Sequence, residues 1–332
     1  MSNIRAIARE AGVSIATVSR VLNNIPGVSE KSRDAVVGAV NRAGYAPEVG
    51  RRSTSNVALV YTSGVSLDSP FDASLVNGIY AGLDGSEADL LILDARRSRQ
   101  PNETLTQMLI RKGAQGALLR MTTASQSLCE DVVTEGFAAV VVGSRPDNPK
   151  LNCIFSDSRP ASQEAVEHLF GLGHQRIAIG THVVDDSDHA DRLAGYRDAL
   201  EARAVLYDEA LVIRSPFDRS GGVQVVRRIA AMSPRPTAIY LADPLMAVGA
   251  LEEARRLGLR VPHDLSVVGF DDGELRHSLV PHLTAVCQDT VALGRASSAL
   301  LLDVIARKHR KPRHEGRRCW FEIHESAAAA PK

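Results

Sequence analysis

The sequence predicts an α/β protein with a small helical head and a two-lobed body, and three observations predict it. From residue 57 onward, short apolar runs alternate with amphipathic stretches of helical length, which is typical of parallel sheets flanked by helices. This region spans about 270 residues, more than one ordinary doubly wound domain, so two lobes are expected. Ahead of it lie three short helical patterns separated by turn residues.

The three helical patterns predict a helix-turn-helix. Gly12 can adopt the left-handed turn after the first helix, Ser14 is a good N-cap for the second, and Ser29 caps the third. At helical spacing, the inward side chains form one small core: Ile4, Ile7, Ala8, Ala11, Val18, Val21, Leu22, Val36, Ala39, Val40 and Ala43.

The body is predicted to contain strands at its short apolar runs. The runs are Val57 to Tyr61, Leu90 to Leu93, Ala117 to Leu119, Ala138 to Val142, Ile177 to Ile179, Ala238 to Leu241 and Leu265 to Phe270. Their continuous apolar character indicates strands that are buried on both faces.

The charge distribution favours nucleic acid as a partner of the head. The 332 residues carry 39 basic and 39 acidic side chains, so the net charge is zero. Residues 1–56 nevertheless contain eight basic and four acidic side chains. A positive head on a slightly negative body is expected when one end of a chain meets a polyanion.

The second helix has an outward face suited to a DNA major groove. The fork of Arg20 matches guanine O6 and N7, and Ile15 and Ala16 can contact thymine methyl groups. Thr17, Ser19 and Asn23 suit phosphates. The alternative is that the head is a protein-interaction module. The predicted DNA contacts are Ser14, Ile15, Ala16, Thr17, Ser19, Arg20, Asn23, Lys31, Arg51 and Arg52.

Residues 4–23, IRAIARE-AGV-SIATVSRVLN, resemble the DNA-binding head of the lactose/galactose repressor (LacI/GalR) family. The similarity continues along nearly the whole chain. It includes Val28-Ser29-Glu30, Gly44-Tyr45-Ala46-Pro47, residues 172–178 (LGHQRIA), residues 192–196 (RLAGY), Pro236-Thr237-Ala238-Ile239 and residues 261–272 (VPHDLSVVGFDD).

This resemblance implies a periplasmic-binding-protein-like body of two lobes, three crossovers and a cleft for a small effector. It also implies a homodimer on palindromic operator DNA. The expected domains are a head at 1–46, a hinge at 47–56, a body at 57–326 and a disordered tail at 327–332. One lobe is expected at about 57–156 and 287–313, and the other at about 157–286 and 314–326.

The hinge departs from the family pattern. In the family, a short helix there drives a leucine into the minor groove, whereas Thr54 stands at the matching position. Threonine is a poor wedge, and Gly50 disfavours a helix. The sequence therefore favours a flexible linker whose Arg51 and Arg52 touch phosphate without kinking DNA.

The cleft also departs from the family. Ala242-Asp243-Pro244 replaces an Ala-Asn-Asp turn, and Asp72 replaces the second of two aromatic residues. Aromatic rings and hydroxyl acceptors suit a carbohydrate effector. The alternative interpretation is that Phe71 and Phe217 belong to the core and that Asp271 caps a helix. The predicted effector contacts are Phe71, Asp72, Asp188, Arg192, Phe217, Asp243 and Asp271.

Other function classes receive little support. The sequence has no phosphate-binding loop, nucleophile elbow or zinc-protease motif, and Gly171-Leu172-Gly173 lacks the third glycine of a dinucleotide site, so neither an enzyme nor a cofactor is expected. The four cysteines show no metal-ligand spacing, so buried thiols and no metal are expected. The chain has a basic head in place of a signal peptide, which favours a cytoplasmic protein over a secreted sugar-binding protein. It has no apolar run of about 18 residues, which disfavours a membrane protein.

Two C-terminal features remain. The basic run from Arg307 to Arg318 is interpreted as a solvated face near the last crossover. The tail from Ala327 to Lys332 has no leucine heptads, so a dimer rather than a tetramer is expected.

Overall fold

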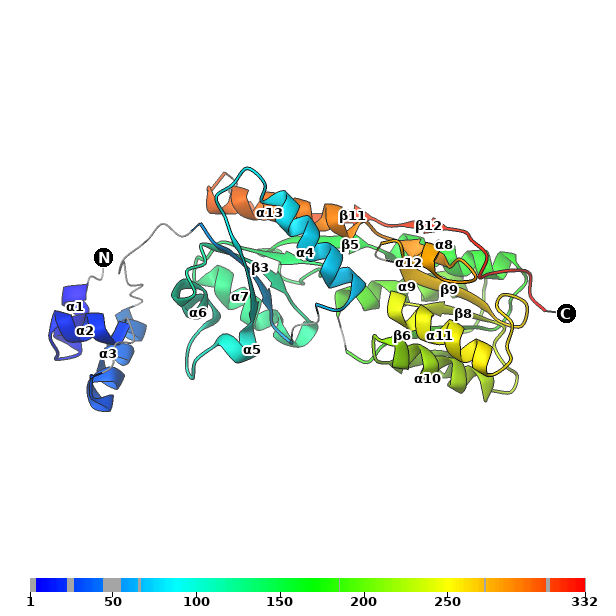
Figure 1. Ribbon diagram of the computed structural model, residues 1–332, viewed down its shortest axis with the longest axis horizontal. Helices are drawn as coiled ribbons and strands as arrows, with labels where there is room; N and C mark the ends of the chain where they lie inside the picture. The colour runs from blue at the N-terminus through cyan, green and yellow to red at the C-terminus, as the bar shows by residue number, and fades with distance from the viewer. Residues whose placement is uncertain are drawn as a thin grey trace.

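The computed structural model describes residues 4–22, 27–43, 55–64, 67–184, 186–271, 273–308 and 311–331 (Figure 1). The predicted hinge residues Gly50, Arg51, Arg52 and Thr54, and the predicted DNA contact Asn23, lie outside these ranges.

The head contains three helices, α1 (Ile4–Glu10), α2 (Ile15–Leu22) and α3 (Glu30–Ala43), as predicted. Gly12 has φ of 65° in the turn between α1 and α2. The hydroxyl of Ser14 accepts a hydrogen bond from the Thr17 amide at 3.1 Å, and that of Ser29 accepts one from the Ser32 amide at 3.3 Å. The head has its own apolar core, whose buried members are Ile7, Ala8, Val18, Val21, Val36 and Ala39.

The first lobe is built on a parallel sheet in the order β11-β5-β4-β3-β1-β2. The strands are β1 (Val57–Tyr61), β2 (Leu90–Asp94), β3 (Gly116–Arg120), β4 (Ala139–Val142), β5 (Asn152–Asp157) and β11 (His314–Arg318). The helices are α4 (Pro70–Gly82), α5 (Ala95–Ser98), α6 (Leu105–Arg111), α7 (Gln126–Thr134) and α13 (Thr290–Ile305).

Successive residues of the central strands face opposite sides of this sheet. Ala58 and Val60 pack with α6 and α7, whereas Val57 and Leu59 pack with α4 and α13. Gly78 of α4 lies against the backbone of α13, so a side chain there would force the helices apart. This close packing fixes α4, whose first turn carries two predicted effector contacts.

The second lobe has a sheet in the order β12-β10-β9-β8-β6-β7, in which only the edge strand β12 is antiparallel among the described strands. The strands are β6 (Ile177–His182), β7 (Val212–Ser215), β8 (Ala238–Leu241), β9 (Ser266–Asp271), β10 (Thr284–Cys287) and β12 (Trp320–Glu322). The helices are α8 (Arg159–Gly171), α9 (Ser187–Ala202), α10 (Arg219–Ala230), α11 (Pro244–Arg256) and α12 (Leu275–Ser278).

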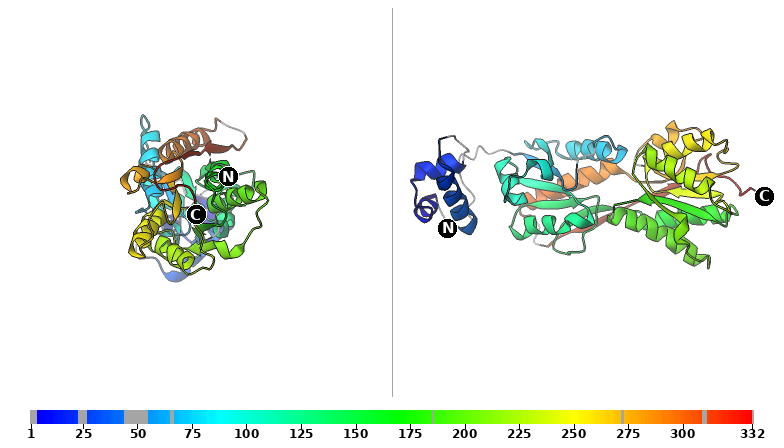
Figure 2. Two further views of the ribbon diagram at one scale, coloured as in Figure 1. Left: turned by 90° about the vertical axis from the view of Figure 1, so that its right-hand side faces the viewer. Right: turned by 90° about the horizontal axis from the view of Figure 1, so that it is seen from below.

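The chain passes between the lobes after β5, after β10 and after β11, and Figure 2 shows the two lobes end to end. The last passage was expected at about residue 313, and in the structure it follows Arg318, a few residues later. β11 still pairs with β5 of the first sheet, from His314 with Cys153 to Arg318 with Asp157. The mostly exposed side chains of β11 agree with the interpretation of this basic run as a solvated face.

The C-terminal tail is ordered up to Pro331, so the prediction of a disordered tail from residue 327 is wrong for the described residues. Ala327 packs on the core of the second lobe, and the Ala330 amide donates to the Leu172 carbonyl at 2.9 Å. The buried His174 ring places Nε2 3.0 Å from the Ala328 carbonyl oxygen and Nδ1 2.8 Å from the Thr237 hydroxyl. These contacts hold the tail on the lobe.

All four cysteines are buried thiols, as predicted: Cys129, Cys153, Cys287 and Cys319. Among the described residues, no helix is both long and apolar enough to cross a membrane.

Candidate functional site

Two adjoining cavities of about 230 and about 470 Å³ lie between the lobes. They share a lining from both lobes, which consists of Met121, Thr122, Ser144, His182, Val184, Asp186 and His189. The lining comes largely from the carboxyl ends of parallel strands and from the helices that follow them, where α/β sheets bind their ligands. The two cavities together form the interlobe cleft.

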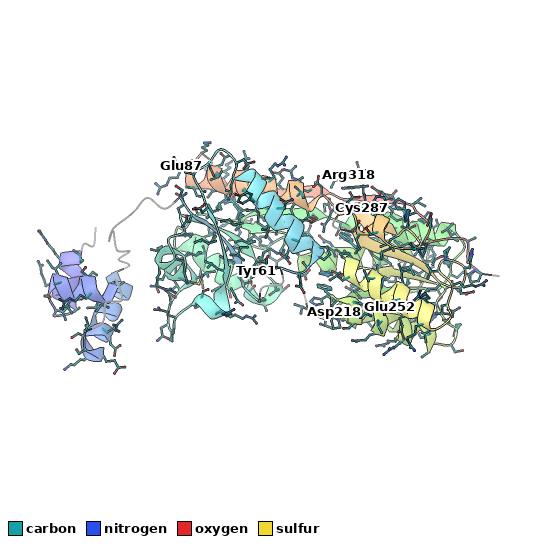
Figure 3. The ribbon with its side chains drawn as sticks, viewed as in Figure 1. Tyr61, Glu87, Asp218, Glu252, Cys287 and Arg318 are labelled. Carbon is teal, nitrogen blue, oxygen red and sulfur yellow. The ribbon has the colours of Figure 1, made fainter. Side chains whose placement is uncertain are left out.

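The wall from the first lobe centres on Asp72, in the first turn of α4. Its amide is capped by the Ser69 hydroxyl at 3.0 Å, and its Oδ1 accepts a hydrogen bond from the Tyr61 hydroxyl at 3.0 Å. Tyr61 is the last residue of β1, and Figure 3 labels it in the first lobe. Arg120 at the end of β3 places Nε 3.3 Å from the same Oδ1 and its guanidinium 4.6 Å from the Phe71 ring centroid. This wall offers a carboxylate, a cation and an aromatic ring.

The wall from the second lobe centres on Arg192 of α9. Its side chain is buried, its Nη1 donates to the Ala242 carbonyl, and its guanidinium lies 3.6 Å from the Phe270 ring centroid. Its Nε has no hydrogen-bond partner among the described residues. A buried donor without a partner costs about 1–3 kcal/mol, so this wall of the cleft carries an uncompensated polar group.

The amino end of α9 gathers groups with shifted pKa values. Burial and the Arg192 charge lower the pKa of His189 to about 4. Burial alone would raise the pKa of Asp186, but hydrogen bonds from His189, whose Nδ1 lies 2.7 Å away, hold it below its usual range. Burial and the neighbouring Asp186 charge raise the pKa of Asp188. The cleft therefore contains a carboxyl that keeps its proton more readily than usual.

An aromatic cluster completes this wall. The His182 ring stacks on Phe217 with 3.2 Å between centroids, and the His189 ring lies 4.0 Å from Phe217. Burial lowers the pKa of His182, which favours its neutral form. Neutral rings in a stack present an apolar face to a ligand.

The structure brings six of the seven predicted effector residues to one cavity, and these are Phe71, Asp72, Asp188, Arg192, Phe217 and Asp243. Asp243 is also the N-cap of α11, where its Oδ1 accepts from the Leu245 amide at 2.8 Å. Both phenylalanines also pack against the core of their lobes, so each of them lines the cavity and contributes to the core as well.

Asp271 differs from the expectation. Its buried carboxylate forms an ion pair with Arg276, with 2.8 Å between Oδ2 and Nη1, and accepts from the Gly273 amide at 3.3 Å. It does not line either cavity. Its charge is already compensated within the second lobe, which corresponds to the alternative of a local structural role.

Four further residues that were not predicted from the sequence also line the cleft, and these are Tyr61, Arg120, His182 and His189. A signal for three of them was present, because Tyr61, Arg120 and His182 end buried apolar strands. A polar group at the carboxyl end of a parallel strand is a binding-site signal in α/β folds.

The predicted DNA-contacting residues of the head are placed on its surface where the structure describes them. Ser14, Ile15, Ala16, Arg20 and Lys31 are exposed, with Ile15 at 45%. Thr17 and Ser19 are half-buried. The hydroxyl of Ser14 is also the N-cap of α2, so part of its role is structural.

Comparisons with known proteins agree with this arrangement. The family profile described as "Bacterial regulatory proteins, lacI family" matches residues 3–48, and the one described as "Periplasmic binding protein-like domain" matches residues 166–320. The HTH-type transcriptional regulator CelR of Thermobifida fusca is 32% identical over 319 residues, which cover 93% of each chain. The chain belongs to the LacI family of bacterial regulatory proteins.

Other LacI-family relatives are similar over nearly their whole length. The ribose operon repressor of Haemophilus influenzae is 31% identical, with 92% of each chain covered. The transcriptional repressor CytR of Escherichia coli K12 is 30% identical, with 93% of this chain and 91% of that protein covered.

Solved structures of the family share the fold. A structure of the CelR–cellobiose complex superimposes with a TM-score of 0.75 at 32% identity and covers 98% of this chain and 100% of that one. The lac repressor dimer bound to operator and the anti-inducer ONPF gives a TM-score of 0.70 at 24% identity, with 99% of both chains covered. The resemblance found in the sequence is confirmed, and this LacI-family chain is a DNA-binding transcriptional regulator rather than an enzyme.

Proposed function

We propose that this LacI-family regulator is a cytoplasmic repressor that binds a palindromic operator as a homodimer and whose operator affinity is controlled by a small carbohydrate in the interlobe cleft. Its relatives include a ribose operon repressor and a regulator in complex with cellobiose. A lac repressor structure is a dimer on operator DNA. These related proteins support a carbohydrate ligand and a dimeric assembly.

The observation that carries this proposal is the composition of the cleft. Asp72 and Asp188 offer hydroxyl acceptors, and Arg192 has a buried donor with no hydrogen-bond partner among the described residues. Phe71 and Phe217 offer rings on opposite walls, one from each lobe. Sugars have apolar ring faces and many hydroxyls, so they need both kinds of partner. Asp271 is left out of the proposed contacts because Arg276 neutralises it.

Control of DNA binding follows from a ligand that touches both lobes. Such a ligand favours one spacing of the lobes, because a ligand shifts an equilibrium only through different affinity for its two states. The lobe that follows the head also carries Asp72 and Arg120. A change in lobe spacing within the dimer would alter the separation of the two heads and hence their fit to two half-sites.

Reading of the operator is assigned to α2. Exposed Arg20 would read guanine, Ile15 and Ala16 would contact thymine methyl groups, and Lys31 would contact phosphate. Arg51 and Arg52 would add phosphate contacts from the linker. Asn23, Thr17, Ser19 and Ser14 would position the helix.

A thermal-shift screen of the full chain against monosaccharides and disaccharides, including ribose and cellobiose, tests the ligand class. A ligand at 100 times its Kd adds about 2.7 kcal/mol to the stability, which gives a clear rise in melting temperature. Any sugar that raises it should also change the retention of operator DNA in a gel shift. Stabilisation by no sugar in the panel would contradict a carbohydrate effector and favour the cleft as a contact site for another protein.

A further inference from the structure

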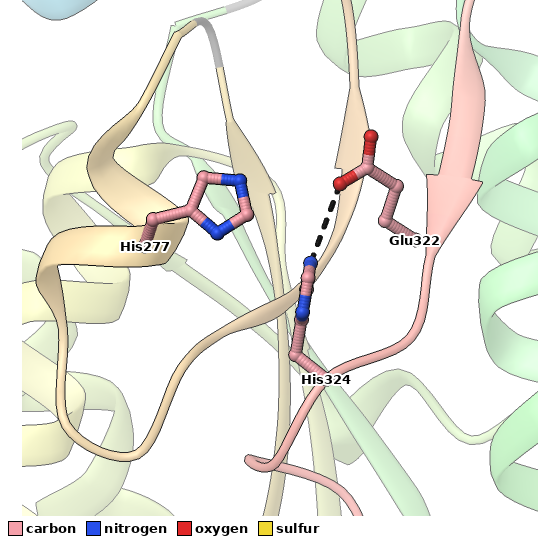
Figure 4. Close-up of side chains that lie close together, drawn as sticks. All are labelled: His277, Glu322 and His324. Carbon is pink, nitrogen blue, oxygen red and sulfur yellow. Dashed lines mark hydrogen bonds and ion pairs between the residues drawn. The ribbon is translucent and has the colours of Figure 1, made fainter.

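Three metal-ligating side chains meet on the second lobe, outside the interlobe cleft. His277 belongs to α12, Glu322 ends β12, and His324 follows two residues later. One ligand atom from each lies within 4.8 Å of the others, and none of the three lines either cavity of the cleft. Figure 4 shows the His277 ring directed toward the other two side chains. No metal site was expected, because the cysteines show no metal-ligand spacing, and His277 lies far from Glu322 and His324 along the chain.

The backbone on both sides of this cluster is held in place. β12 pairs with β10, and the His324 amide donates to the Thr284 hydroxyl at 2.9 Å. The Arg276 Nε donates to Glu322 Oε2 at 2.7 Å and so connects α12 to β12. The three side chains therefore come from two segments with a fixed spacing.

The spacing of the two histidine rings fits two imidazoles on one tetrahedral ion. With Zn–N near 2.1 Å, two coordinated imidazole rings have centroids about 5.2 Å apart. The centroids of His277 and His324 are 5.1 Å apart, with an interplanar angle of 84°. Two ligand atoms of a tetrahedral zinc ion are about 3.4 Å apart. Glu322 Oε2 and His324 Nε2 are 3.3 Å apart.

The local charge also suits a cation. The Arg276 guanidinium is shared by two carboxylates, those of Asp271 at 2.8 Å and Glu322 at 2.7 Å. One cation and two anions leave one negative charge beside the imidazoles. Hydrogen bonds from Arg276 and from Trp320 Nε1, at 2.6 Å from Oε1, would orient the carboxylate as outer-shell partners do in metal sites.

We propose that His277, Glu322 and His324 bind one divalent transition-metal ion, with Zn²⁺ as the best match to two imidazoles and a carboxylate. The ion takes the place of the hydrogen bond between His324 and Glu322, and water completes the tetrahedron. The ring of His282 is not a ligand, since its centroid lies 6.2 Å from that of His277 and 6.5 Å from that of His324. An ion here fastens α12 to the C-terminal segment of the second lobe.

Calorimetric titration with zinc tests this site. The protein is full-length, carries no tag and is first stripped of metal with a chelator, and its metal content is measured after dialysis. We expect one zinc ion per chain. Because loss of outer-shell partners alone lowers metal affinity about 10- to 100-fold, His277→Ala and His324→Ala should each lower it at least about 10-fold. His282→Ala and His263→Ala, which alters an exposed histidine elsewhere on the same lobe, should leave it unchanged.

Two control measurements separate a loss of metal binding from a loss of folding. The side chain of His277 is 42% exposed, so its removal should leave the circular dichroism and melting temperature of the metal-free protein unchanged. Cobalt(II) bound in place of zinc should give the intense visible absorption of a tetrahedral site, and this absorption should be lost in His277→Ala. The proposal would be overturned if the protein bound no zinc, or if binding survived both ligand substitutions. Saturation at half an ion per chain would also overturn it.

Discussion

Arg145 of the first lobe and Asp191 of the second form an ion pair across the interlobe cleft, with 2.8 Å between Nη2 and Oδ1. The Arg145 amide also donates to the Ser187 hydroxyl of the second lobe at 2.7 Å. Arg145 follows β4, and Asp191 lies in the first turns of α9. These contacts favour the spacing of the lobes seen in the structure.

Arg145→Ala is expected to weaken effector binding, because the lobe spacing that binds the ligand becomes less populated. Partly exposed ion pairs contribute about 0.2–1 kcal/mol, so the Kd should rise by no more than about five-fold. Calorimetry with a sugar that stabilises the wild type measures this. Arg159→Ala is the control, since it breaks an ion pair with Asp198 within the second lobe. An equal effect of both variants would show that the pair across the cleft has no special role.

Arg20→Ala should reduce discrimination between operator and random DNA. Loss of one bidentate base contact costs about 1–3 kcal/mol, and the loss should be confined to the specific sequence. Lys31→Ala should weaken binding to both DNAs alike, because phosphate contacts carry no sequence information. Fluorescence anisotropy with an operator selected from randomised palindromic duplexes compares the two. If Arg20→Ala also weakens both DNAs alike, Arg20 does not read a base.

The pH dependence of stability contains two opposing contributions at the amino end of α9. The pKa of His189 is lowered to about 4 by burial and by Arg192. Between about pH 4 and 6.5 the unfolded chain therefore binds a proton that the folded chain does not, and stability falls as the pH falls. The pKa of Asp188 is raised by burial and by Asp186, so its contribution runs the other way and is lost as the pH rises through the raised pKa.

Substitutions should separate these contributions. His189→Gln should reduce the loss of stability at acid pH, and Asp188→Asn should make stability rise more steeply with pH, each by at most about 1.4 kcal/mol per pH unit. Urea unfolding at several pH values measures the slopes. Asp131→Asn alters an exposed carboxyl and should leave the slope unchanged. Shifts of the same sign in the two cleft variants would contradict the assigned directions.

Removal of the C-terminal tail should destabilise the second lobe. His174 places Nε2 3.0 Å from the Ala328 carbonyl and 3.0 Å from the Ser266 hydroxyl. Truncation after Ser326 removes the Ala328 carbonyl, which the buried His174 ring and the Ser266 hydroxyl both contact, at a cost of about 1–3 kcal/mol. Urea unfolding should show this loss, and removal of Lys332 alone should show none. A truncated protein of unchanged stability would mean that the tail contributes nothing to folding.

Burial explains which strands the sequence predicted. Val57–Tyr61 and Ala238–Leu241 are continuous apolar runs because both sheet faces are covered, and their bounds were predicted without error. β11 reads HEGRR, with mostly exposed side chains at a sheet edge. Backbone pairing with β5 holds it there, and such pairing leaves no apolar pattern in the sequence.

The cleft was predictable only in part, because some of its contacts depend on how distant segments pack together. The resemblance to the family gave positions such as Asp72 and Arg192. The sequence did not show that Arg120 and Asp72 pair, because that contact depends on the packing of β3 beside β1 and α4. The ion pair of Asp271 with Arg276 was not predicted either, because Arg276 lies in the short helix α12, whose position beside the end of β9 the sequence does not reveal.

Control of DNA binding through the interlobe cleft is tested most directly by operator binding with and without a sugar. The measurement compares the wild type with Arg192→Ala. Arg192 lines the cleft, whereas the head has a separate apolar core. A stabilising sugar should therefore change the operator affinity of the wild type in fluorescence anisotropy and leave that of Arg192→Ala unchanged, with equal affinities in the absence of sugar. Arg197→Ala, an exposed change on the same helix, should behave as the wild type does. An undiminished sugar response in Arg192→Ala would contradict control of DNA binding through this cleft.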